Sequence, residues 1–263
     1  MKRYIKLYFK LSSQYMKTLM EYRTDFLIGL VAFFFIQGFG IAFLYLVFNN
    51  IPSINGWSFN EVLFIYGFAN LPRGIDHLLT DNLWLLSGRI IVRGDFDRYL
   101  LRPMNPLFFL CADRFQPDAF GELIVGMLLV IYSLTSLTIK IGILEILGFI
   151  LAVLGGTIIY TSVKLIFASL AFWIKRSQAI LFIAYQMSNF AKYPMSIYGK
   201  FINVILTFII PFAFTAFIPA SWFLGKSTFL YGVVLTMLCA VIFFTGAYKI
   251  WDTGLKQYES AGN

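Results

Sequence analysis

The sequence contains few charged residues, a single histidine and only two cysteines. Charged residues make up 13% of its 263 residues, whereas about 25% is usual in a soluble domain. The histidine is His77, and Cys111 and Cys239 fall in different hydrophobic segments. Neither a Cys/His metal cluster nor a disulfide framework can be built from so few residues. We therefore expect no metal site and no bound cofactor in this chain.

Sequence motifs for catalysis are also missing. Gly225-Lys226-Ser227 matches the end of a phosphate-binding loop, but Ala220 occupies the position where such a loop needs its first glycine. The sequence has no Gly-x-Ser-x-Gly and no His-Glu-x-x-His motif. Outside its hydrophobic segments it has no basic stripe interleaved with aromatic residues, the pattern that binds nucleic acid. We predict that the chain has no catalytic residues, does not hydrolyse ATP and does not bind nucleic acid.

Hydrophobic residues, in contrast, make up 59% of the chain. A soluble domain could not hide this much apolar surface, because even a domain of about 300 residues buries only about 75% of its surface. A lipid bilayer removes the difficulty, and a helix of about 20 apolar residues is long enough to cross it. We predict an all-α membrane protein in which residues 25–263 form a single transmembrane domain of about six transmembrane helices. Their approximate limits are 26–48, 59–82, 120–139, 146–174, 177–191 and 229–249.

Residues 201–224 are apolar but are interrupted by Pro211 and Pro219. This stretch is either a seventh span or a hairpin that enters the membrane and returns on the same side. Lys and Arg favour the cytoplasmic side, and with six spans 15 of the 21 Lys and Arg residues fall there. The external side then receives Lys140, Lys192, Lys200 and Lys226. We therefore predict six spans, both termini in the cytoplasm, and an external re-entrant hairpin at 201–224.

Residues 1–24 are predicted to form a separate amphipathic helix at the membrane surface. Two sets of residues recur at helical spacing on different faces, namely Arg3, Lys6, Lys10 and Lys17 on one face and Tyr4, Tyr8, Leu11, Tyr15, Leu19 and Tyr22 on the other. On this interpretation the tyrosines lie at the depth of the lipid headgroups and the lysines contact anionic lipid. The alternative is a plain basic tail that only satisfies the preference of cations for the cytoplasmic side.

Ionisable residues lie within the predicted spans, among them Arg73, Asp76 and His77 in the second, Glu122 in the third and Lys164 in the fourth. Ionisable side chains within a membrane are costly and often mark a transport path. We consider Arg73, Asp76, His77 and Lys164 candidates for such a path. Glu122 and Lys164 have a simpler alternative, because a long polar side chain can extend to the membrane surface.

The segment 89–114 is strongly basic and contains glycine and proline, as expected of a cytoplasmic loop. Gly94 can end one helix, Asp95 can cap the next, and Pro103 can close this second, short helix. The alternative is an ordinary loop whose charges only reflect its side of the membrane.

Three stretches of the sequence resemble a group of permeases in the bacterial ABC-2 family. The first is the basic segment RIIVRGDFDRYLLRPMNP (89–106), which is similar to the first cytoplasmic loop of that group. The second is YPMSIY (193–198), followed by PFAF (211–214) and PA (219–220), and the third is WDTGLKQYESAG (251–262). They occur in the family's order across nearly the whole chain.

The resemblance implies the fold of a type-2 ABC exporter in the bacterial inner membrane, with Pro211 and Pro219 in the external hairpin. It implies a permease that exports a substrate by alternating access, driven by a dimer of cytoplasmic ATPases that bind ATP and Mg. It also implies a second permease subunit, with a heterodimer favoured over a homodimer. The residues expected to couple this chain to the ATPase are Arg93, Gly94, Asp95, Asp97, Arg98, Arg102 and Pro103.

Two other classes of function compete with this one. A membrane-embedded enzyme would need a pair of catalytic groups facing each other in the bilayer, and the sequence offers no convincing pair. An ATP-independent secondary transporter or channel would need an ion relay or a selectivity ring. The two halves of the sequence show no convincing repeat of the kind common in secondary transporters. The transporter or channel is the alternative that stays open.

Overall fold

The computed structural model describes residues 2–117, 119–137, 139 and 141–260. Lys140, the side chain of Arg3, and the last residues of the terminal motif, Ala261 and Gly262, lie outside the described part. The described residues form helices and no β-strand, which confirms the predicted all-α fold class. The α-helices are α1 (Lys2–Glu21), α2 (Arg23–Asn50), α3 (Phe59–Thr80), α4 (Leu83–Leu85), α5 (Asp97–Leu100), α6 (Pro106–Ala112), α7 (Ala119–Ser136), α8 (Ile143–Ser169), α9 (Ala171–Ile174), α10 (Gln178–Gln186), α11 (Lys200–Val204), α12 (Phe217–Phe223) and α13 (Leu235–Lys256).

Shorter 3-10 and π-helical pieces link or extend these helices. They are η1 (Leu86–Ile90), η2 (Met187–Lys192), η3 (Met195–Ile197), η4 (Ile205–Ile209), η5 (Phe212–Thr215) and η6 (Leu230–Val234).

Four helical segments of the described chain are long and apolar enough to cross a membrane. They are α2, α7, the combined Ile143–Ile174 and the combined Leu230–Lys256. Helix α3 has 22 residues but carries Arg73 and Asp76 within them. The stretch predicted as the fifth span, 177–191, is not one continuous α-helix, because α10 ends after nine residues and the chain continues as the 3-10 helix η2.

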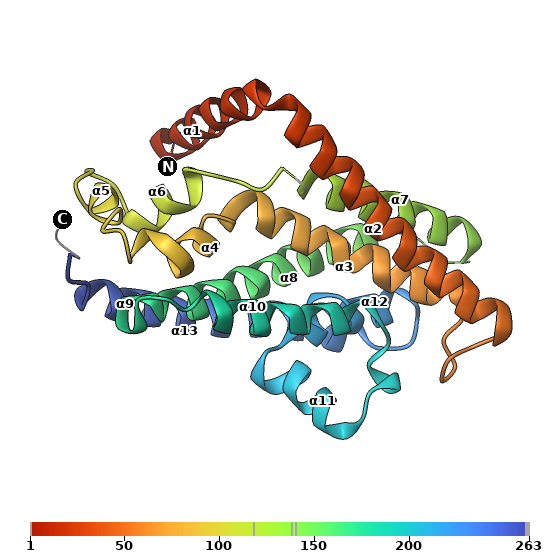
Figure 1. Cartoon of the computed structure of the whole chain (residues 1–263). Helices are drawn as coiled ribbons and strands as arrows, with labels where there is room; N and C mark the ends of the chain where they lie inside the picture. The colour runs from red at the N-terminus through yellow and green to blue at the C-terminus, as the bar shows by residue number, and fades with distance from the viewer. Residues whose placement is uncertain (1, 118, 138, 140, 261–263) are drawn as a thin grey trace.

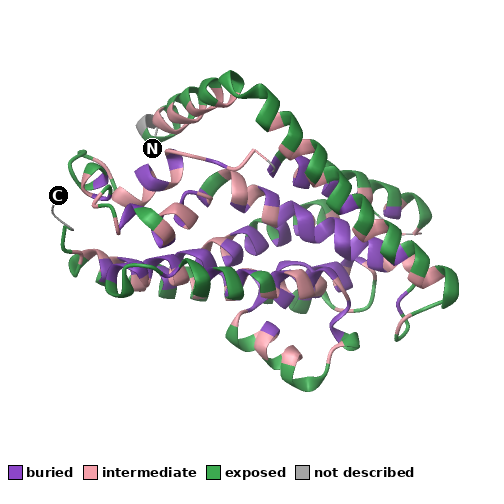
Figure 2. Cartoon of the chain, in the orientation of Figure 1, coloured by how far each residue is buried: buried purple, intermediate pink, exposed green. Residues whose placement is uncertain are grey.

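Helix α3 lies at the centre of the bundle, packed against α7 and α8, and α8 packs in turn against α13 (Figure 1). Glycines allow α3 and α7 to approach closely. A Cβ atom added at Gly126 would lie only 2.9 Å from the carbonyl oxygen of Gly67. Burial follows this arrangement: α3 and α8 are buried along much of their length, whereas α2 is largely exposed (Figure 2). The exposed face of α2 is apolar, as suits a surface that contacts lipid or another membrane subunit.

Helix α1 is separate from α2 and lies at the same end of the bundle as α5, α6 and the end of α13 (Figure 1). Several of its tyrosines contact the protein. The Tyr8 hydroxyl donates to the carbonyl of Leu78 at 3.3 Å, and the Tyr4 ring packs edge-on against Phe108 with centroids 4.8 Å apart. One face of this amphipathic helix therefore packs on the bundle.

The stretch 201–224 forms a helix, a break and a second helix. Helix α11 and the π-helix η4 form the first arm, which ends at Ile209. The helix breaks at Ile210 and Pro211, and α12, which contains Pro219, forms the second arm. Residues at the break are buried, and the ring of Phe212 lies 5.2 Å from that of Tyr160 on α8. The first arm is partly exposed, with Leu206 buried. Two half-helices that meet at a buried break are the form that a re-entrant hairpin requires.

Candidate functional site

Helix α3 brings three of the candidate residues to one region of the bundle. Arg73, Asp76 and His77 are spaced three and four residues apart, so they lie on neighbouring positions of the helix surface. Helices α7, α8 and α10 face them and supply further polar groups. The structure therefore gathers the four predicted path residues, together with Glu122, into one network.

The innermost part of the network is an ion pair between Asp76 and Lys164. The Lys164 ammonium lies 2.6 Å from Asp76 Oδ2, and both side chains have 0% exposure. Three hydroxyls also donate to the Asp76 carboxylate: Thr80 at 2.6 Å, Thr161 at 2.9 Å and Tyr185 at 3.0 Å. A buried charge needs a partner and hydrogen bonds of this kind to offset its lost hydration. Lys164 does not extend to the membrane surface.

A second ionic cluster lies beside the first and is centred on Glu122. Its Oε1 atom is 3.3 Å from Arg73 Nε, and its Oε2 atom is 3.0 Å from His77 Nδ1. Arg73 also donates from Nη1 to the Asn189 side chain at 3.2 Å. Glu122 is buried between two partners on α3, so the interpretation that it extends to the membrane surface is wrong.

Tyr185 connects the two clusters. Its hydroxyl is 3.0 Å from Asp76 Oδ2 and 2.8 Å from His77 Nε2. A phenol has one proton to donate. When Tyr185 donates it to Asp76, the contact with His77 is a hydrogen bond only if His77 Nε2 carries a proton. Tyr185 thus places the His77 imidazole and the inner ion pair on one continuous path of hydrogen-bond contacts.

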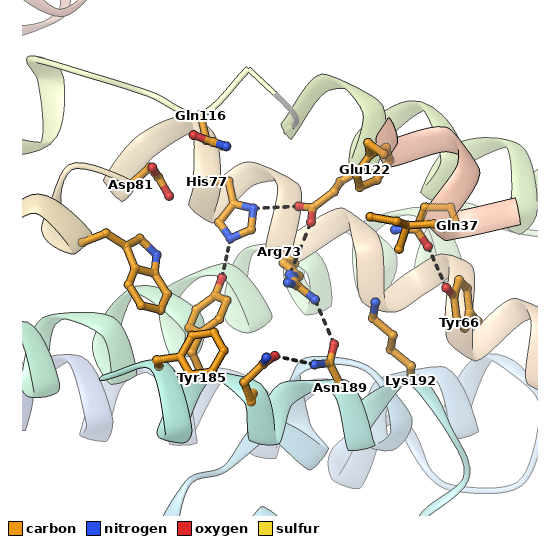
Figure 3. A pocket seen from close by; sticks show the side chains of 15 residues that line it. Gln37, Tyr66, Arg73, His77, Asp81, Gln116, Glu122, Tyr185, Asn189 and Lys192 are labelled. Carbon is orange, nitrogen blue, oxygen red and sulfur yellow. Dashed lines mark hydrogen bonds and ion pairs between the residues drawn. The ribbon is translucent and has the colours of Figure 1, made fainter. Parts of the chain in front are cut away.

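These groups border a pocket of about 550 Å³ between α2, α3, α7 and the α10–η2 segment (Figure 3). The side chains labelled in Figure 3 converge from these elements. Sequence reasoning missed six of them: Gln37, Tyr66, Gln116, Tyr185, Asn189 and Lys192. Only Gln37 carried a signal, as the one amide in the apolar run 26–48. Tyr66 lies on α3 itself, and the other four lie in segments whose sequence gives no sign that they face α3.

The predicted coupling residues form a second site, at the end of the bundle where α5 lies (Figure 1). Gly94 has a positive φ of 72°, the conformation that glycine adopts most easily. The prediction that Asp95 caps the next helix is wrong, because α5 has Phe96 at its N-cap position and no side-chain cap. Asp95 is exposed in the turn before α5 and makes no capping hydrogen bond to that helix.

The C-terminal segment is anchored to this loop through Asp97. The Tyr258 hydroxyl donates to Asp97 Oδ1 at 3.0 Å, and the Ser260 hydroxyl donates to Oδ2 at 2.6 Å. The Tyr258 ring also packs edge-on against Phe96, with centroids 5.0 Å apart. Burial, and next the hydrogen bond to Asp97, raise the pKa of Tyr258 to about 12. A tyrosine hydroxyl is protonated at neutral pH even with its ordinary pKa, and the raised pKa keeps it a donor in alkaline solution as well.

Arg98 and Arg102 differ in their surroundings. Arg98 forms an ion pair with Asp113 at 2.7 Å, so it holds the loop to the segment that follows α6. The guanidinium of Arg102 lies 4.4 Å from the centre of the Phe109 ring, and the residue is exposed, as are Arg93 and Pro103. Leu101, next to it, is 84% exposed. The tip of the loop thus presents a leucine and cations.

The motif-like Gly225-Lys226-Ser227 lies in a turn after α12. The Lys226 ammonium is 2.8 Å from Glu61 and donates to the carbonyl of Gly56 at 2.9 Å. It is thus engaged within the chain. Among the residues that the structure describes, no group of three or more His, Cys, Asp or Glu side chains could hold a metal ion.

A bundle with several membrane-length helices around a polar pocket belongs to the class of multi-pass membrane proteins. Sequence comparison then gives the family: the model described as ABC-2 family transporter protein matches residues 34–262. The chain belongs to this family and is the membrane permease of an ABC transporter, as the resemblance of its three stretches implied. Comparison with curated proteins and with solved structures finds no match.

Proposed function

We propose that this chain is the membrane subunit of an ATP-driven exporter in the bacterial inner membrane, with both termini in the cytoplasm. ATP and Mg bind to a separate dimer of cytoplasmic ATPase subunits. The observation that carries the proposal is the loop around α5. Leu101 and Arg102 project from it, while Asp97 and Arg98 are held by the rest of the chain. A rigidly supported loop with an exposed tip suits the transmission of rigid-body motion.

A short series of contacts leads from this loop to the pocket. Asn82 follows the end of α3, five residues after His77. Its amide donates to the carbonyl of Leu110 at 2.8 Å and lies 3.4 Å from the Tyr99 hydroxyl on α5. Movement of α5 by an ATPase would therefore act on the end of α3, which carries the ionic network. Alternating access requires such a link between the two sites.

A second permease subunit would pack on the exposed face of α2. This face has a shallow hollow of about 450 Å³ bordered by apolar side chains, Gly38 and Ala42. Small residues four positions apart allow close packing of helices within a membrane. The pocket also opens beside α2, so a dimer of permeases would enclose it. We favour a heterodimer over a homodimer.

The test is co-expression with the genes that flank its own, followed by purification in detergent. We expect an ATPase subunit and a second permease to co-purify. The double variant Leu101→Asp/Arg102→Glu should retain at most about a tenth of the ATPase, which corresponds to about 1.4 kcal/mol of binding free energy. It should elute like the wild type in size-exclusion chromatography, because both side chains are exposed.

Lys200→Glu is the matched control, since it reverses an exposed cation on α11, away from the loop. It should leave ATPase binding unchanged. Purification of the wild type as a lone, transport-competent oligomer would overturn the proposal. So would full retention of the ATPase by the Leu101→Asp/Arg102→Glu variant.

A further inference from the structure

The pocket contains a buried lysine, Lys192, whose ammonium has no direct ion-pair partner within the described chain. Lys192 is only 9% exposed, and its ammonium makes no hydrogen bond or ion pair with any described residue. Its nearest partner is the face of the Tyr66 ring, 5.2 Å away. A buried charge without a partner is strongly unfavourable. An anion placed beside Lys192 would therefore be strongly stabilised.

The carboxylates nearby make their direct contacts with other cations, and Glu122 acts on Lys192 only at longer range. Glu122 is already shared between Arg73 and His77, and Asp76 is paired with Lys164. Asp81 also borders the pocket, but at the opposite end from Lys192 (Figure 3). The end of the pocket that holds Arg73, Asn189 and Lys192 thus has an excess of positive charge and of hydrogen-bond donors.

The mouth of the same pocket is apolar. Ile36 of α2 and Phe182 of α10 border it and are exposed on the outer surface of the bundle. In a bilayer such side chains face lipid tails or another membrane helix. A ligand with a charged head and an apolar tail would place the head beside Lys192 and the tail between these two helices.

We infer that the pocket binds the anionic headgroup of an amphiphile, with Lys192 as the principal contact of the anion and the tail in the apolar mouth. This inference rests on the proposed function, because it assigns an anionic amphiphile as the substrate class of the permease. Lys192 and Arg73 neutralise the headgroup, and Asn189 sets the orientation of the Arg73 guanidinium through its 3.2 Å hydrogen bond. Charge-assisted bonds of this kind are among the strongest that a protein forms.

The test is binding of dodecyl phosphate to the purified wild-type permease in nanodiscs of phosphatidylcholine, without ATP. Lys192→Met removes the charge but keeps the length of the side chain, and we expect it to weaken binding at least tenfold. Lys200→Met is the matched control, because Lys200 is exposed on α11 outside the pocket. It should bind dodecyl phosphate like the wild type.

Three further probes define the ligand class. Dodecylphosphocholine and dodecyltrimethylammonium should bind at least tenfold more weakly than dodecyl phosphate, because they carry no net negative charge. Inorganic phosphate should also bind more weakly, because it cannot use the apolar mouth. Equal binding of dodecyl phosphate by Lys192→Met and the wild type would overturn the inference, as would equal loss in Lys200→Met. Tighter binding of the cationic amphiphile or of inorganic phosphate would also overturn it.

Failure of this inference can be told apart from failure of the proposed function. Binding is measured on the permease alone, and the ATPase is recruited by the separate loop around α5. If the inference fails while the ATPase co-purifies, the permease function stands with another substrate class. If the ATPase does not co-purify while Lys192-dependent binding persists, the inference that the pocket binds an anionic amphiphile is retained, and the protein uses an energy source other than this ATPase.

Discussion

Replacement of Lys164 by methionine tests whether the inner ion pair is structural. Met has a similar length but no charge, so it leaves the Asp76 carboxylate buried without its cation. Removal of one partner from a buried ion pair costs about 3–5 kcal/mol. The three hydroxyls that donate to Asp76 remain, so we expect the lower end, about 3 kcal/mol. At about 2–4 °C per kcal/mol for a chain of this size, the unfolding midpoint should fall by about 6–12 °C.

The assay is thermal unfolding of the purified protein in one detergent, followed by the loss of monodisperse protein in size-exclusion chromatography. Lys256→Met is the matched control, because it removes the cation of an ion pair in which Lys256 is 72% exposed. Exposed pairs contribute only about 0.2–1 kcal/mol. The control should therefore lower the midpoint by less than about 4 °C.

The double variant Asp76→Asn/Lys164→Met distinguishes two effects: the loss of the attraction between the two charges, and the cost of leaving one buried charge without a partner. It leaves no buried charge at this place, so we expect it to be more stable than Lys164→Met alone. The reasoning would be refuted if Lys164→Met were as stable as the wild type. It would also be refuted if the double variant lost as much stability as the two single changes added together.

Two further predictions concern helix packing and the C-terminal anchor. Gly126→Ala should destabilise the protein by about 1–3 kcal/mol, because its Cβ would meet the backbone of α3. Gly246→Ala is the control: a Cβ there has no atom within 4 Å, so this change should stabilise the helix by up to about 1 kcal/mol. A loss of equal size in both, measured by thermal unfolding, would contradict the close approach. Tyr258→Phe should lower the free energy of unfolding by about 1 kcal/mol and speed amide hydrogen exchange at residues 257–260. Tyr248→Phe is the control and should do neither. Unchanged exchange in Tyr258→Phe would show that the hydrogen bond to Asp97 does not hold the C-terminal segment in place.

The fold class could be predicted from the sequence because apolar runs of membrane length are a strong signal. The spans that the sequence delimits best, such as 26–48, are those whose helices are exposed and apolar all round. The segment 177–191 shows the limit of that signal. Its composition is apolar, but the change from α-helix to 3-10 helix after Gln186 depends on packing against the centre of the bundle, which hydropathy does not report.

The candidate site could be predicted only in part. Arg73, Asp76, His77 and Lys164 stood out because each is charged or polar within an apolar run. Tyr185 and Asn189 did not, because both are uncharged, tyrosine is common near membrane surfaces, and no local pattern shows which way either side chain faces. Their roles follow from the approach of α10 and η2 to α3, a contact between segments more than 100 residues apart.

The polar network also explains why the second span is the hardest to delimit in the sequence. Helix α3 lies among α7, α8 and α10 rather than against lipid, so its lower half can carry Arg73, Asp76 and His77 at little cost once Glu122 and Lys164 pair with them. Those partners come from α7 and α8, and their charges make their own spans less regular. The irregularities in three separate runs therefore have one cause. In a membrane protein of this kind, we expect the span with the weakest hydropathy signal to be the one that lines the transport path.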